Sequence, residues 1–179
     1  MTALDPKKLI FIDESGANLR MANRYARAVG GQRAKMPIPC NRGPNISIIG
    51  AVSMRKVEAA LYGEWATNSE IFLIFIDRCL SPQLRPGHIV IMDNVRFHYQ
   101  SKIVEIIESK GASVVFLPPY SPDFSPIENM WSKIKNYLRG FMPRTMQEFK
   151  KSIKSAFESI SESNLIGWFK HCGYNVQTR

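Results

Sequence analysis

Residues 9–16 read LIFIDESG, and residues 88–94 read HIVIMDN. Each stretch is a nearly continuous apolar run that ends in an aspartate, Asp13 in the first and Asp93 in the second. Short apolar runs of this kind are typical of strands that are buried on both faces at the centre of a sheet. We therefore expect two neighbouring central strands, residues 8–13 and 88–93, with both carboxylates at one edge of the sheet.

The rest of the chain predicts three further strands and a set of helices. Residues 46–53 and 57–65 predict an antiparallel hairpin, and residues 114–117 predict a last short strand. Apolar residues recur at helical spacing over 69–80, where Asn68 is the expected N-cap, and over 99–110. Further helices are expected from Ser125, after Thr145 and over 164–172. The T-x-x-E pattern of Thr145 and Glu148 predicts a capping box at the second of these.

This order of elements predicts a single α/β domain over residues 1–179, with a mixed five-stranded sheet flanked by helices. Residues of about 16–45 are rich in Gly, Pro and Arg without a clear period, and they predict a long basic loop with at most a short strand over 25–29. C-terminal helices are expected over about 145–172.

A third acidic residue, Glu128, lies at the start of the helix that follows Ser125. With Asp13 and Asp93 it would complete the oxygen-rich ligand set that Mg²⁺ or Mn²⁺ prefers. Other interpretations are open, because either aspartate could cap a turn after its strand. Glu128 could likewise bond the backbone N–H of Ser125 in a capping box.

Helical spacing divides the helix after Ser125 into two stripes. The polar stripe carries Glu128, Ser132, Lys135 and Arg139, and the apolar stripe carries Ile127, Met130, Trp131, Ile134 and Leu138. An acid followed by bases on one face suits a site that holds a phosphodiester, although such a stripe is also common on a solvated face.

The chain is strongly basic, since 24 Lys and Arg against 15 Asp and Glu give a net charge of +9 and a pI near 9.6. No acidic residue lies between Glu14 and Glu58. This distribution favours contact with nucleic acid over a merely solvated basic surface. The candidate DNA contacts are Arg20, Arg24, Arg27, Arg33, Lys35, Arg42, Lys133, Lys135 and Arg139.

Three other residues could support the acidic ones without binding a metal. Glu14 should point to the opposite side of the strand from Asp13. Asn94 follows Asp93 directly, and His98 lies five residues beyond it, with a role that the sequence leaves open.

Several classes of protein are disfavoured. No apolar run approaches the roughly 20 residues of a membrane-spanning helix, and the start, MTALDPKK, has no apolar signal region. We therefore expect a cytoplasmic protein with no membrane partner. The three cysteines are scattered without a CxxC pair, which disfavours a disulfide framework or a zinc site. No GxxxxGK[ST] phosphate loop is present, so no nucleoside triphosphate is implied.

Three blocks of sequence resemble one known family. They are IDESG at 12–16, MDNVRFH at 92–98 and LPPYSPDFSPIENMWSKIK at 117–135, with the 34 residues 94–127 between the second and third acids. Together they resemble the DDE transposases of the mariner-like superfamily, and most of all its bacterial insertion-sequence branch. The resemblance extends over about residues 9–139. It implies an RNase H-like fold in a protein of the bacterial cytoplasm or nucleoid, with Asp13, Asp93 and Glu128 as the catalytic, metal-binding triad.

The resemblance also implies a chemistry. Two divalent ions, Mg²⁺ or Mn²⁺, would lie about 3.5–4 Å apart and be bridged by the first aspartate and the scissile phosphate. One ion would activate water or a DNA 3′-hydroxyl, and the other would stabilise the leaving oxygen. The same site would then cut the ends of the element and join them to target DNA without a covalent enzyme intermediate.

Two departures from the family pattern affect the expected partners. Ser125 stands where many relatives have Asn, and both residues are good helix caps. The chain starts almost on its first catalytic strand, so we expect no N-terminal helix-turn-helix domain in it. A separate polypeptide or an upstream reading frame would then recognise the element ends, and cutting paired ends would favour a homodimer on DNA. The alternatives are an RNase H-like endonuclease without strand transfer and a non-catalytic DNA-binding remnant.

Overall fold

The computed structural model describes residues 5–21, 27–33, 35, 43–93, 100–118 and 122–176. The strands are β1 (Leu9–Ala17), β2 (Ile46–Ser53), β3 (Val57–Gly63), β4 (Ile89–Met92) and β5 (Ser113–Phe116). The helices are α1 (Ser69–Ile74), which continues as the π-helical segment Phe75–Leu80, α2 (Gln100–Glu108), α3 (Pro126–Phe141), α4 (Met146–Glu158) and α5 (Glu162–His171). Short 3₁₀ turns cover Pro6–Lys8, Ser81–Gln83 and Pro122–Phe124.

The five strands form one mixed sheet in the order β3-β2-β1-β4-β5. The first three strands are an antiparallel meander, while β4 runs parallel to β1 and β5 runs parallel to β4. The prediction that the two aspartate-ended strands are neighbours is therefore confirmed. Parallel strands need crossover connections, and the segments that contain α1 and α2 provide them.

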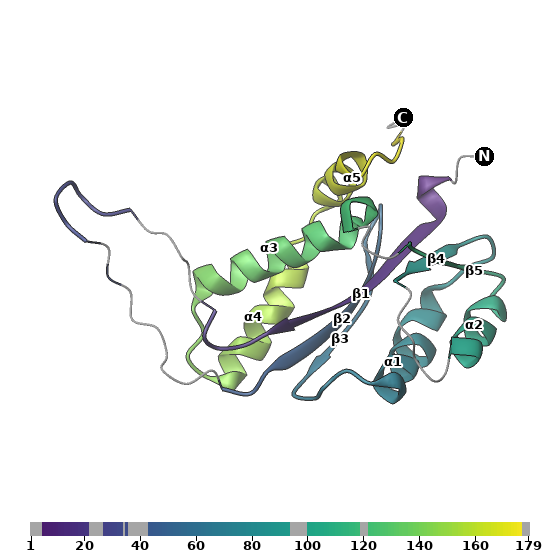
Figure 1. Ribbon diagram of the computed structural model, residues 1–179, viewed down its shortest axis with the longest axis horizontal. Helices are drawn as coiled ribbons and strands as arrows, with labels where there is room; N and C mark the ends of the chain where they lie inside the picture. The colour runs from purple at the N-terminus through teal and green to yellow at the C-terminus, as the bar shows by residue number, and fades with distance from the viewer. Residues whose placement is uncertain are drawn as a thin grey trace.

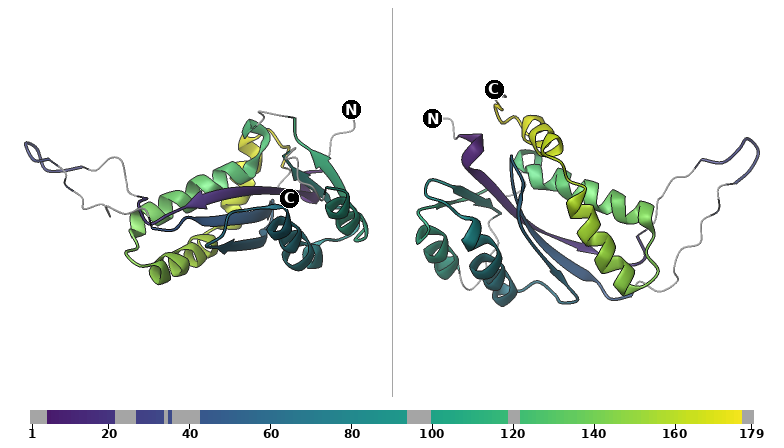
Figure 2. Two further views of the ribbon diagram at one scale, coloured as in Figure 1. Left: turned by 60° about the horizontal axis from the view of Figure 1, so that its bottom comes forward. Right: turned by 180° about the vertical axis from the view of Figure 1, so that it is seen from behind.

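Helices cover both faces of the sheet (Figures 1 and 2). On one face Leu9 and Phe11 of β1 pack in a cluster with residues of α3, α4 and α5. On the other face Ile10 and Ile12 pack with residues of α1, the π-helical segment and α2. Because side chains alternate along a strand, this arrangement directs the next odd-numbered residue, Asp13, toward the α3 layer.

Several predicted element boundaries differ from the observed ones. β1 continues past Asp13 to Ala17, because its polar second half keeps the backbone ladder with β2 as far as the pair Ala17 and Ile46. β3 ends at Gly63, two residues before its predicted end. The suggested strand over 25–29 lies partly outside the described residues, and 27–29 are not a strand.

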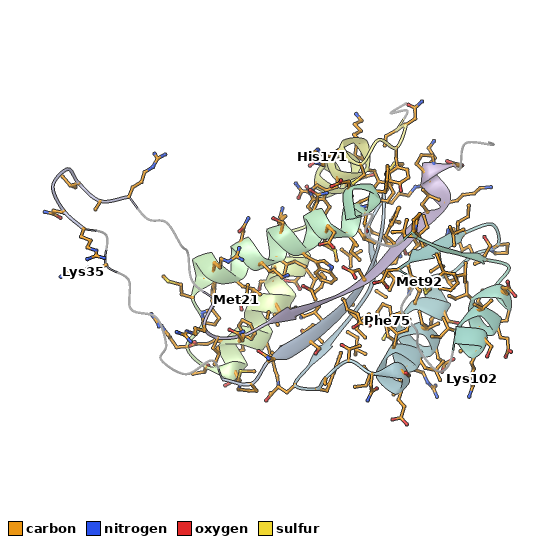
Figure 3. The ribbon with its side chains drawn as sticks, viewed as in Figure 1. Met21, Lys35, Phe75, Met92, Lys102 and His171 are labelled. Carbon is orange, nitrogen blue, oxygen red and sulfur yellow. The ribbon has the colours of Figure 1, made fainter. Side chains whose placement is uncertain are left out.

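The predicted helix over 69–80 is confirmed in extent. The Asn68 side chain caps it by accepting a hydrogen bond from the Ile71 backbone N–H at 2.9 Å. Its second half widens into a π-helix whose Phe75 and Ile76 are fully buried beneath the sheet, and Figure 3 shows Phe75 on the same side of the molecule as Met92. Among the described residues, no helix is long and apolar enough to cross a membrane.

Candidate active site

Asp13 lies in the middle of β1, where it pairs with Gly50 of β2. Its side chain is half-buried and faces the α3 layer. The indole N–H of Trp131, on α3, donates a hydrogen bond of 2.8 Å to Oδ2 of Asp13. The first predicted acid therefore has a defined contact with the helix that carries the third one.

Asp93 lies one residue beyond the end of β4 and is exposed. The parallel register pairs Leu9 with Ile89 and Phe11 with Ile91, so continuing it at the same offset brings Asp93 level with Asp13. Phe11 and Ile91 belong to the same face of the sheet. By strand alternation the two aspartates therefore share that face as well.

Glu128 lies in the first turn of α3 and is exposed. The capping-box interpretation of this residue is wrong, because the Ser125 side chain makes no capping hydrogen bond. The only described bond between the two residues runs from the Glu128 backbone N–H to the Ser125 carbonyl oxygen, at 3.2 Å. By contrast, the predicted box at Thr145 and Glu148 does form. Helix capping thus gives no account of the Glu128 carboxylate.

The other two carboxylates act electrostatically on Asp13. Burial raises the pKa of Asp13 to about 6, against hydrogen bonds from the Glu14 backbone and the Trp131 indole that lower it. The negative charges of Glu128 and Asp93 raise this pKa further, which places both within electrostatic range of Asp13. Among the described residues, no basic side chain is one of the groups that shift it.

Asp93 is exposed by surface area, yet neighbouring groups crowd its carboxylate. This partial desolvation raises the pKa of Asp93, and a hydrogen bond from its own backbone opposes the rise. Two of the three acids are therefore less easily ionised than free aspartate. A nearby cation would reverse that effect.

The chemistry of the donors fits a divalent cation, since Mg²⁺ and Mn²⁺ prefer carboxylate oxygens. The spacing is wider than a bound ion needs. Within the described parts of the chain, no group of three or more His, Cys, Asp or Glu side chains is close enough to hold a metal ion.

Of the three residues predicted to support the acids, the structure describes only Glu14. Glu14 follows the alternation of the strand, and its side chain hydrogen-bonds Thr67, which precedes α1. Burial raises the pKa of Glu14, and the charges of Asp13 and Asp93 add to the rise. Asn94 and His98 lie outside the described residues.

One labelled residue of the basic segment between β1 and β2, Lys35, lies far from β4 (Figure 3). Figure 3 labels Lys35 at the far end of the molecule from Met92, the residue before Asp93. Arg20, Arg27, Arg33 and Lys35 are exposed, and Arg24 and Arg42 lie outside the described residues. Lys35 is therefore not next to the candidate site (Figure 3).

The basic residues of α3 lie closer to Glu128. Lys135 and Arg139 are half-buried on its polar stripe, and Arg139 donates a hydrogen bond of 2.8 Å from Nη1 to Oδ1 of Asn136. The Nζ of Lys133 instead donates to Oδ1 of Asn164, so this lysine connects α3 to α5.

Trp131 was predicted only as part of an apolar stripe. The stripe itself is confirmed, since all five of its residues are buried. The missed signal is the indole N–H, because a buried tryptophan usually needs an acceptor for it. Here that acceptor is an acidic side chain of the sheet.

A mixed five-stranded sheet with helices on both faces, and with carboxylates on β1 and just beyond β4, defines an RNase H-like fold. The model of the family described as DDE superfamily endonuclease matches residues 8–150, and the chain belongs to that family.

Solved structures of the Mos1 transposase share this fold. The pre-cleavage Mos1 transpososome has a TM-score of 0.77 at 15% identity and covers 93% of this chain and 53% of its own. The Mos1 strand transfer complex has a TM-score of 0.73 at 18% identity, and the match covers 93% of this chain and 51% of the Mos1 chain. The catalytic domain of Mos1 mariner transposase has a TM-score of 0.66 at 14% identity and covers 93% and 78%.

The chain spans about half the length of the transposase chains in the first two of these structures. At such low identity the likeness establishes the fold. No curated protein sequence matches the chain.

Proposed function

We propose that the chain is a transposase catalytic domain that cleaves DNA strands at the ends of an element and joins them to target DNA. One observation carries the proposal: Asp13, Asp93 and Glu128 come from three separate segments of an RNase H-like fold, namely β1, the end of β4 and the first turn of α3, and the latter two raise the pKa of the first. Solved structures of Mos1 support it, since they include a strand transfer complex and paired-end complexes with Mn and with Mg.

In this proposal the three carboxylates hold two divalent ions, Mg²⁺ or Mn²⁺. Divalent ions bound by these carboxylates would supply Lewis-acid chemistry at the scissile phosphate, for the attacking water or 3′-hydroxyl and for the leaving oxygen. Asp13 is the ligand fixed from within the protein, because β1 and the Trp131 hydrogen bond hold it. Asp93 and Glu128 are exposed and would complete the ligand set from the end of β4 and the first turn of α3.

The DNA is proposed to contact two groups of basic residues. Lys135 and Arg139 share the polar face of α3 with Glu128 and suit phosphates close to the cut. The exposed residues of the segment between β1 and β2 suit DNA farther from it.

The wider assignment follows the three sequence blocks. We infer that the chain belongs to the bacterial insertion-sequence branch and that it works in the cytoplasm as a homodimer on DNA.

The test is nicking and strand transfer on a plasmid that carries the native element ends, with Mg²⁺ or Mn²⁺. Asp93→Ala is expected to reduce both activities below detection, because one ligand of the ions is lost. Salt-sensitive DNA binding is expected to remain, since it depends on the basic residues. Asp77→Ala is the matched control, because Asp77 is an exposed acid in the π-helical segment on the other face of the sheet.

Each outcome separates the candidate functions. Nicking without strand transfer would identify an RNase H-like endonuclease. DNA binding without any cutting by the wild-type protein would identify a non-catalytic remnant. Activity that survives Asp93→Ala or Glu128→Ala would contradict the assignment of the triad.

A further inference from the structure

Trp131 connects the helix of one proposed ligand to the strand of another. It lies on α3, three residues after Glu128, and its side chain is 2% exposed. Its only polar atom, Nε1, donates to Oδ2 of Asp13 at 2.8 Å. This distance is short for an N–H···O bond and is typical of a charged acceptor.

Gly50 provides the space for this contact. It is the cross-strand partner of Asp13, so a side chain at position 50 would stand beside Asp13 on the same face of the sheet. A Cβ on Gly50 would lie 2.8 Å from Cη2 and 3.3 Å from Cζ2 of Trp131, and 3.0 Å from Cε of Met130. The indole ring therefore occupies the volume that a side chain of β2 would otherwise fill.

The ring is also held from the helical layer. Phe157 of α4 contacts it edge to face, with the ring centroids 6.4 Å apart and the planes at 82°. Contacts with Gly50 and Phe157 limit the rotation of the indole, and this fixes the direction of its N–H. Fixed donors of this kind orient metal ligands in many sites.

We propose that Trp131 is a positioning residue for the metal site, and that its indole N–H sets the orientation of Asp13 relative to the helix that carries Glu128. The inference rests on the proposed function. The bond leaves Asp13 able to bind ions, because a carboxylate offers about four lone-pair sites and Trp131 uses one of them. Since α3 carries both Trp131 and Glu128, the same bond also fixes the β1 ligand relative to the α3 ligand.

Trp131→Phe removes the N–H and keeps an aromatic ring. It is expected to weaken Mn²⁺ binding, measured by isothermal titration calorimetry without DNA, by about 10- to 100-fold. Strand cleavage is expected to fall at low Mn²⁺ and to recover as Mn²⁺ is raised. Trp168→Phe, the same change in a partly buried tryptophan packed against the same core cluster, is expected to leave both properties unchanged.

A tryptophan with a purely structural role would give a different result. Trp131→Phe would then lower thermal stability while Mn²⁺ affinity stayed at the wild-type value, and this result would overturn the inference. Asp13→Asn separates the inference from the proposed function. If Asp13→Asn abolishes Mn²⁺ binding and Trp131→Phe does not change it, only the inference fails. If Asp13→Asn leaves Mn²⁺ binding unchanged, the proposed site fails and the inference fails with it.

A second measurement does not depend on the folding of the Trp131 variant. The chain has three tryptophans, and their indole N–H signals can be followed by NMR in protein labelled with ¹⁵N-tryptophan. Trp65→Phe and Trp168→Phe assign the signals by elimination. Mg²⁺ is expected to shift the Trp131 signal with the same midpoint as a calorimetric titration of Mg²⁺ into the same protein, because its acceptor becomes a metal ligand. A Trp131 signal that stays unchanged while Mg²⁺ binds would contradict the inference.

Discussion

Replacing Asp13 with asparagine is expected to abolish DNA cleavage and, in the same protein, to raise the free energy of unfolding of the metal-free form by about 2 kcal/mol at pH 7. The gain arises because the pKa of Asp13 is raised to about 6 by burial and by the nearby charges of Glu128 and Asp93. Asparagine has the same shape, cannot ionise, and can still accept the Trp131 hydrogen bond. It removes the repulsion while it keeps the contact.

The sign follows from proton linkage. The ordinary pKa of 3.8 applies to the unfolded chain, and the folded value of about 6 lies above it. The folded protein therefore binds more protons between these values. The stabilising contribution of Asp13 is full below about pH 3.8 and is lost as the pH rises through about 6. The advantage of asparagine should grow over this window and level off above it.

Urea denaturation between pH 4 and pH 7.5, in the presence of EDTA, measures this prediction. Asp77→Asn is the control, because Asp77 is exposed and forms an ion pair with Arg78 in the segment after α1. The prediction fails if Asp13→Asn raises the free energy of unfolding equally at pH 4 and pH 7, or lowers it at pH 7. Either result would mean that burial and the nearby charges do not raise the pKa of Asp13.

Gly50→Ala is expected to destabilise the protein by about 1–3 kcal/mol and to weaken metal binding. The added Cβ would meet the Trp131 ring at 2.8 Å, which is closer than carbon atoms approach without one of them moving. The movement would shift the indole N–H away from Asp13. The glycine is thus required for space.

Gly16→Ala is the matched control for this change. Gly16 lies on β1, is exposed, and has no atom within 4 Å of an added Cβ, so its replacement should change stability by less than about 0.5 kcal/mol. In the double variant Gly50→Ala/Trp131→Phe the smaller ring should relieve part of the clash. The double variant should therefore lose less stability than the sum of the losses in the two single variants. Equal stability of Gly50→Ala and Gly16→Ala, measured by thermal denaturation, would argue against the tight contact.

The sequence predicts the fold well wherever a local pattern has one physical meaning. The apolar runs before Asp13 and Asp93 predict neighbouring central strands, and β1 and β4 do pair in parallel. Alternation along β1 is enough to place Asp13 and Glu14 on opposite faces. The capping motif at Thr145 forms as written.

Interactions between distant residues are less accessible from the sequence. Helical spacing places Trp131 on the buried stripe, but its partner Asp13 lies 118 residues earlier in the chain. The requirement for Gly50 arises from the same contact and has no local signal. The motif at Ser125 has the right letters for a capping box, yet its hydroxyl makes no capping bond. A net charge likewise counts basic residues without locating them, so the sequence does not reveal that Lys133 bonds to Asn164 of α5.

The central claim is that Asp13, Asp93 and Glu128 act together as one divalent-metal site. The most direct test is calorimetric titration of Mn²⁺ into the wild-type protein and into Asp13→Asn, Asp93→Asn and Glu128→Gln. We expect the wild-type protein to bind Mn²⁺ and each single substitution to weaken binding by at least about tenfold, because each removes one ligand of a shared site. Wild-type affinity in Asp93→Asn or Glu128→Gln would contradict it.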